Sequence, residues 1–251
     1  QTFSVKVGHF YTIIGYEGVP SINNFFYSKS FAYQFAGPFT HWGGLATWHL
    51  NDRITLQGGL VNGWDSLDRT KDSTTGLASI KYTAPENLWS LSFSMVTGNE
   101  PSAVATQFET RTRYSLIFTA HPAERWEYVF HHHYAYQNQG KVDGGTARWY
   151  RIDHYLYYGL IDQWRVGLRF EWMRDEAGTR VGGNPVRDNP NLGPFAGSFY
   201  SLSAGLNYRP HPNVLIRPEV RADWFDGQRS PYNDGLNKNQ VLAAINGTLQ
   251  F

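Results

Sequence analysis

Hydrophobic and polar residues alternate with a period of two along most of the chain, whereas helical spacing hardly occurs. Between residues 163 and 175, for example, Trp164 and Leu168 share one face, while Arg165 and Arg169 share the other. This alternation is typical of strands whose two faces meet different surroundings. It predicts twelve strands, at residues 3–13, 40–50, 53–64, 74–84, 88–98, 108–121, 125–138, 146–161, 163–175, 197–210, 213–226 and 238–251.

The connections between these strands alternate in length. Short turns at 51–52, 85–87, 122–124, 162 and 211–212 consist of turn-forming or charged residues, and longer polar segments join the other strand pairs. Short turns at one end and long loops at the other are the connectivity typical of an outer-membrane barrel. The termini of such a barrel lie on the periplasmic side, where the short turns are. We therefore expect an all-β fold, a single antiparallel transmembrane β-barrel domain over residues 1–251, with twelve strands or a larger even number if strands precede residue 1.

Composition removes several other classes of protein. Lys plus Arg is 22 and Asp plus Glu is 21, so the net charge of +1 provides no uniform field for nucleic acid, and no nucleic-acid partner is expected. Without cysteine there is no disulfide, thiolate metal site or cysteine nucleophile. No apolar run approaches the roughly 18 residues that a membrane helix requires. A mean hydropathy of −0.46 nevertheless coexists with 9 Trp, 16 Tyr and 16 Phe.

Many of the large rings lie near the ends of the predicted strands, as expected of aromatic girdles at two lipid–water interfaces. The tryptophans assigned to these girdles are Trp48, Trp64, Trp89, Trp126, Trp149, Trp164, Trp172 and Trp224. The alternative is a soluble sandwich or lipocalin-like barrel with its apolar face inward. We favour a lipid-facing apolar surface because the opposite face is charged along much of its length.

That opposite face is expected to line a pore. Its charged residues are Lys6, Arg53, Lys81, Arg113, Arg151, Asp153, Arg165, Arg169, Glu171, Arg217, Glu219, Arg221 and Asp223. Nine basic and four acidic side chains leave a charge of +5. These groups can pair as struts across a hydrated lumen, or some can form a charged constriction. We expect a weak preference for anions, carried mainly by Arg165, Arg169, Arg217 and Arg221 and reduced by salt screening and the adjacent acids.

The connection over residues 18–38 is long and rich in aromatic rings. The rings belong to Phe25, Phe26, Tyr27, Phe31, Tyr33 and Phe35. A solvent-exposed loop rarely carries so much ring area without covering something. Two arrangements are considered: a hairpin that extends the first two strands above the membrane, which is the one expected, and an inward fold that narrows the pore.

Candidate chemistry is sparse. On a strand His131 and His133 share a face while His132 points away, so at most two of them can bind one metal, and zinc needs further ligands; Glu127 shares that face. Polar filling of the lumen is therefore expected, with no metal and no cofactor. The common zinc-protease, esterase and nucleotide-binding motifs do not occur, so no enzyme is expected, although a Ser–His–acid site assembled from distant strands is left open.

Four stretches carry a family resemblance: residues 7–17 (VGHFYTIIGYE), 26–30 (FYSKS), 37–43 (GPFTHWG) and 59–65 (GLVNGWD). They resemble the OmpL-like outer-membrane beta-barrel porin family, and the terminal Phe251 is similar to the assembly signal of outer-membrane barrels. The resemblance implies a porin-like channel in a Gram-negative outer membrane, in contact with outer-membrane lipid. Passive diffusion of small hydrophilic solutes or ions is the leading function; a structural scaffold in a larger assembly and an outer-membrane hydrolase are the alternatives. A homo-oligomer or a partner in a membrane complex is left open.

Overall fold

A computed structural model describes residues 2–67, 74–103, 107–182 and 194–250. All twelve predicted strands are present, each within three residues of its expected ends. They are β1 (Thr2–Tyr11), β2 (Thr40–His49), β3 (Ile54–Val61), β4 (Thr75–Thr83), β5 (Trp89–Pro101), β6 (Phe108–Ala120), β7 (Trp126–Gln137), β8 (Ala147–Ile161), β9 (Trp164–Asp175), β10 (Gly197–His211), β11 (Val214–Gly227) and β12 (Asn239–Leu249).

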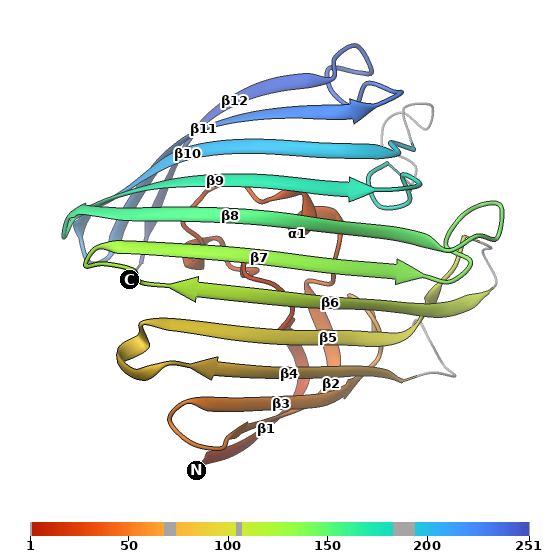
Figure 1. Ribbon diagram of the computed structural model, residues 1–251, viewed down its shortest axis with the longest axis horizontal. Helices are drawn as coiled ribbons and strands as arrows, with labels where there is room; N and C mark the ends of the chain where they lie inside the picture. The colour runs from red at the N-terminus through yellow and green to blue at the C-terminus, as the bar shows by residue number, and fades with distance from the viewer. Residues whose placement is uncertain (1, 68–73, 104–106, 183–193, 251) are drawn as a thin grey trace.

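The strands form one antiparallel sheet in which every strand pairs with its neighbours in sequence. The sheet curves strongly around a concave side, and both ends of the chain lie at the end with the short turns (Figure 1). Among the described residues, β1 pairs with β2 alone and β12 with β11 alone. The expected all-β barrel architecture is confirmed.

Helical structure in residues 2–67, 74–103, 107–182 and 194–250 is limited to short pieces. These are η1 (Ser21–Asn23) and α1 (Phe31–Phe35), both between β1 and β2, and η2 (Pro85–Asn87) in the turn before β5. Within the described ranges, no helix has the length and apolar character needed to cross a membrane.

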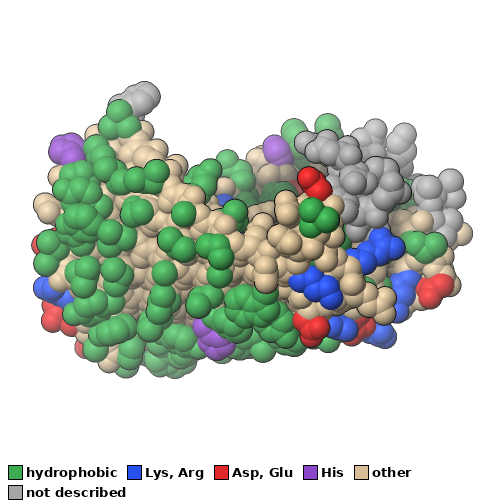
Figure 2. Space-filling model, turned by 90° about the horizontal axis from the view of Figure 1, so that it is seen from above, with side chains coloured by type: hydrophobic (Ala, Val, Ile, Leu, Met, Phe, Trp, Pro, Cys, Tyr) green, Lys and Arg blue, Asp and Glu red, His purple; other side chains and the backbone are tan. Residues whose placement is uncertain are grey.

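The two faces of the sheet differ as the alternation predicts. Outward positions are apolar and exposed, with Leu168 at 50% and Ile245 at 74% exposure. By contrast, the inward residues Arg169 and Glu171 of β9 are completely buried. In the view of Figure 2, hydrophobic side chains cover much of the wall, and most charged side chains lie toward its two ends. An apolar belt between polar ends is the surface that a membrane barrel requires.

The assignment of tryptophans to girdles is only partly correct. Trp48, Trp89 and Trp126 are exposed on the outer face, but Trp64 and Trp149 are buried, at 3% and 0% exposure. Trp149 is two residues from Arg151 and therefore lies on the same, inner face. There its indole Nε1–H donates to the carbonyl oxygen of Ala36 at 3.0 Å. Trp149 was assigned from its place near a strand end without regard to the side of the strand, whereas Trp64 lies beyond the end of β3.

Candidate functional site

Residues 12–39, which connect β1 to β2, fold onto the concave side of the sheet; we call them the inserted segment. Figure 1 shows this segment, with α1, behind β7 to β9. Its residues bond to the far wall: the backbone N–H groups of Phe31 and Ala32 donate to Glu171, each at 2.9 Å. The expected hairpin above the membrane is therefore wrong. The inward arrangement covers Phe26 and Phe31, which are 3% and 7% exposed.

Hydrogen bonds within the inserted segment define its local conformation. The Asn24 side chain closes its first half by accepting from Gly18 N–H at 2.9 Å and donating to Gly18 O at 2.8 Å. Ser30 then caps α1, because its hydroxyl accepts from Tyr33 N–H at 3.1 Å. Serine is a favoured residue at this position since its side chain replaces the missing backbone acceptor. A polar framework of this kind holds the aromatic rings in fixed positions.

Glu17 ties the segment to β9. One of its oxygens accepts from Arg169 at 2.8 Å, and the other accepts from the Ser30 backbone at 3.0 Å and the Ser30 hydroxyl at 2.6 Å. Glu171 provides a second anchor on the same strand, where it accepts the first two N–H groups of α1 and lies 3.8 Å from Arg151. Both carboxylates are buried with their acceptors occupied, which is the condition under which buried charge is tolerated.

β11 provides the other anchors. Arg217 donates to the carbonyl oxygens of Ser21 and Asn24 at 2.8 and 2.7 Å. Arg221 donates to Lys29 O at 2.6 Å and to Asp223 at 2.6 Å. The inserted segment is thus held along most of its length by arginines and carboxylates of the wall.

The residues predicted to line a pore fall into three groups. One group is buried between the wall and the inserted segment: Arg113, Arg151, Asp153, Arg169, Glu171, Arg217, Glu219, Arg221 and Asp223. Arg165 is half-buried beside Glu127, while Lys6 and Lys81 are exposed at inward positions of β1 and β4. Arg53 is exposed in the turn before β3 begins.

Sequence reasoning missed the contribution of the segment's own polar residues. Glu17 and Lys29 are the only charged residues between positions 12 and 39, so an isolated acid in an aromatic loop was an available signal. The aromatic contacts were missed as well. Arg169 lies 4.8 Å above the Phe26 ring, and a Cβ at Gly167 would come within 2.5 Å of Phe25, so glycine leaves room for that ring.

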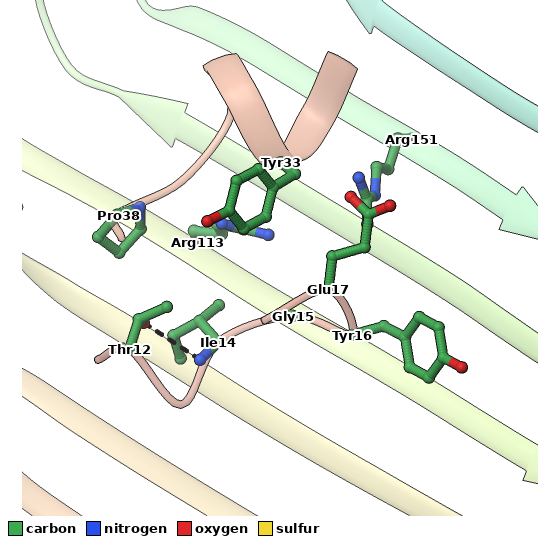
Figure 3. Close-up of a pocket in the computed structure, with 9 residues that line it drawn as sticks. All are labelled: Thr12, Ile14, Gly15, Tyr16, Glu17, Tyr33, Pro38, Arg113 and Arg151. Atoms are coloured by element: carbon green, nitrogen blue, oxygen red, sulfur yellow. Dashed lines mark hydrogen bonds between the residues drawn. The ribbon is translucent and has the colours of Figure 1, made fainter. Parts of the chain in front are cut away.

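Two cavities flank Tyr16 and Glu17. The larger, about 90 Å³, is lined by Asn23, Asn24, Phe25, Phe26, Tyr155 and Tyr157 in addition. The smaller, about 10 Å³, lies between β6, β8 and the inserted segment, and Figure 3 shows Arg113 and Arg151 reaching it from the wall.

The histidines on the inner face form a buried cluster with their neighbours. His131 Nε2 lies 2.7 Å from the Ser115 hydroxyl, and His131 Nδ1 lies 3.5 Å from Asp153. The order of groups is that of a Ser–His–acid site, but Arg151 donates to His131 Nδ1, so that nitrogen carries no proton for Asp153. Ser115, His131 and Asp153 are also completely buried, away from any substrate. Within the described residues, no group of three or more His, Cys, Asp or Glu could hold a metal ion.

The contacts of Glu17 predict how the attachment of the inserted segment to the wall depends on pH. Burial alone raises the pKa of the Glu17 carboxyl, but Arg169, the Ser30 hydrogen bonds and Arg151 outweigh it and hold the pKa below 4.5, its ordinary value. The stabilisation is complete above that value and is lost as the pH falls through the lower folded pKa. Between pH 7 and 5 we expect steady single-channel current, with increased current noise only at lower pH. Glu17→Gln should be noisy already at pH 7; equal noise in both proteins at pH 7 would contradict the assignment.

A membrane-facing wall of twelve strands around an inward-folded segment defines an outer-membrane β-barrel channel. The chain belongs to the family described as "Putative beta-barrel porin-2, OmpL-like", which matches residues 1–251.

Solved structures support the fold. The outer membrane channel DcaP of Acinetobacter baumannii is similar with a TM-score of 0.67 and 14% identity, over 97% of this chain and 71% of that one. In-vitro folded OmpT, an outer membrane protein of Vibrio cholerae, gives a TM-score of 0.67 and 10% identity, over 99% and 76%. No curated protein matches the chain. The protein is a porin-like channel of the outer membrane.

Proposed function

We propose that this porin-like channel is a narrow pore for passive diffusion of small hydrophilic solutes, with the inserted segment setting its bore. The observation that carries the proposal is the docking of this segment on β9 and β11 through Glu17, Glu171 and Arg217. Barrels of sixteen to eighteen strands hold an aqueous channel, whereas eight strands enclose little more than side chains. A twelve-stranded wall with a segment folded inside therefore favours small solutes.

The inner face of β2 to β5 near the short turns supports a route for these solutes. Thr47, Gln57, Ser79 and Ser92 occupy inward positions there, and all four are partly exposed and uncharged. Hydroxyl and amide groups exchange hydrogen bonds with water and polar solutes without holding ions tightly.

We propose a weak preference for anions. Arg169, Arg217 and Arg221 are buried and occupied by carboxylates and carbonyl oxygens, which reduces their effect on a passing ion. The exposed inward residues Lys6 and Lys81 support the preference instead. Because exposed charges act over a Debye length of about 8 Å at physiological salt, the preference is modest.

The zero-current potential of single channels in a salt gradient tests this preference. We expect weak anion selectivity in the natural protein and a shift toward cations in the double variant Lys6→Glu with Lys81→Glu. Arg53→Glu is the matched control, since this exposed residue lies in a turn, and it should shift the potential less. Cation selectivity in the natural protein, or an unmoved potential in the double variant, would refute the proposal.

One set of proteoliposome measurements distinguishes the diffusion channel from two other functions, a hydrolase and a structural scaffold. Solute-induced swelling without hydrolysis supports a diffusion channel that acts without enzymatic activity. Lipid or ester hydrolysis without solute-induced swelling would favour a hydrolase, and a stoichiometric partner that copurifies with a non-permeable barrel would favour a scaffold. We also propose that the short turns and both termini face the periplasm, as in other outer-membrane barrels.

A further inference from the structure

Arg113 is a buried cation that no carboxylate among the described residues neutralises. It lies on the inner face of β6 and is 4% exposed. Its only hydrogen bond among the described residues is a long one, from a terminal nitrogen to His133 Nδ1 at 3.5 Å. No carboxylate of the described chain lies within 4 Å of it, and its Nε–H has no acceptor.

Other buried arginines of the wall have protein partners for their guanidinium groups. Arg151 is 2.6 Å from Asp153, and Arg169 is 2.8 Å from Glu17. Arg217 lies within 4 Å of no carboxylate in the described part of the chain, but its donors are occupied by Ser21, Asn24 and Asn246. An isolated buried charge is strongly unfavourable, so the exceptional state of Arg113 requires an explanation.

The segment around Arg113 is built to admit its guanidinium. A Cβ at Gly37 would overlap one terminal nitrogen at 1.3 Å, and a Cβ at Gly15 would lie 3.5 Å from the other. Gly15 also has a φ of +106°, a conformation that side chains rarely adopt. The two glycines therefore hold the two limbs of the inserted segment against the guanidinium.

The small cavity lies at this point. Its lining includes Arg113, Arg151, Tyr33, Thr12 and Glu17. Figure 3 shows the arginines entering from the wall and Tyr33 from α1. The volume of about 10 Å³ corresponds to roughly one water-sized particle.

The polar groups of the lining favour a negative particle. No hydrogen bond joins the Tyr33 hydroxyl to another described residue, and burial raises the pKa of Tyr33 to about 12, so it remains a donor at neutral pH. Glu17 is the one carboxylate of the lining, but its oxygens already accept from Arg169 and Ser30. Arg151 adds positive charge, which Asp153 and Glu171 partly offset.

We propose that a single small anion of halide size binds in this cavity as the counter-ion of Arg113, with the Tyr33 hydroxyl as a second donor. The bound ion neutralises the guanidinium and joins the inserted segment to β6, on which it has no carboxylate anchor. This inference is independent of the selectivity of the pore, because an ion held between the wall and the inserted segment can be present whichever ion the open passage prefers.

The first test is thermal unfolding of the whole protein in detergent at constant ionic strength, with chloride replacing gluconate, which is too large for the cavity. Binding to the folded state should raise the unfolding temperature by a few degrees and saturate with chloride concentration. Arg113→Gln should remove the chloride response. Arg217→Gln, a buried arginine already occupied by protein groups, should keep it even if its unfolding temperature is lower.

The second test locates the ion. Crystals grown in bromide should give an anomalous peak beside the Arg113 guanidinium, and the peak should be absent in Arg113→Gln. An equal chloride response in natural protein and Arg113→Gln, or a well-ordered site without an anomalous peak, would overturn the inference. If the pore proves not to prefer anions but the chloride response and the anomalous peak are both observed, the proposed anion preference is rejected and the anion site at Arg113 stands.

Discussion

Replacing residues 14–37 with a four-residue Gly/Ser turn is expected to raise single-channel conductance by about threefold, because it removes a helix-containing segment roughly 10 Å across from the lumen. The chain ends need not move, since Thr12 N–H already donates to Phe39 O at 2.9 Å and a short turn can close the hairpin there. The wall should remain folded because all twelve strands pair without help from this segment.

The matched control is a shortened loop at residues 139–145, between β7 and β8. Its Val142 is 97% exposed, so its removal changes loop length without opening the lumen. Conductance in that variant should equal that of the natural protein. An unchanged conductance after removal of residues 14–37 would mean that the segment does not set the bore.

Glu171→Ala is expected to lower the free energy of unfolding by about 3–5 kcal/mol, the usual consequence of removing one partner from a buried charge pair. Glu171 is completely buried and accepts the N–H groups of Phe31 and Ala32, while Arg151 lies 3.8 Å away. Its loss leaves two buried donors without acceptors and frees α1 from β9. Current recordings should therefore show large fluctuations, in addition to a lower unfolding temperature.

Glu127→Ala provides the comparison for this variant. Glu127 pairs with Arg165, whose side chain is 42% exposed, so the pair is partly solvated and its removal should cost less than about 1 kcal/mol. If the two variants lose similar stability, or if Glu171→Ala leaves the current steady, Glu171 is not the anchor of α1. Glu171→Gln should fall between alanine and the natural residue because its amide oxygen still accepts one N–H.

The strands could be predicted from sequence because each strand face meets a single environment. Lipid selects Leu168 and Phe170 on the outer face of β9, while the inner side selects Arg169 and Glu171. That contrast is repeated along most strands and defines both the elements and their register. It also places Trp149 on the inner face, because Trp149 and Arg151 are two residues apart on the same strand.

The path of the inserted segment could not be predicted in this way, because a loop has no alternating pattern. Its aromatic content indicated that it covers something, but not which surface. The deciding contacts join Glu17, Ser28 and Ser30 to residues more than a hundred positions away along β8, β9 and β11, and such pairings leave no local signal. The count of +5 on the inner face was similarly incomplete, because it omitted Glu17 of the inserted segment and wall residues such as Glu127 and Asp175.

The anchoring of the inserted segment also bears on the order of folding. Ser28 and Glu219 are 191 positions apart, Phe31 and Glu171 are 140 apart, and Ser21 and Arg217 are 196 apart. The segment leaves the ribosome early, yet every strand that holds it is synthesised much later. Contacts of such high sequence separation form slowly because a long loop must close first. Docking of the segment is therefore a late step in folding, and until β9 and β11 are in place its aromatic side chains lack the wall that buries them and need protection from aggregation.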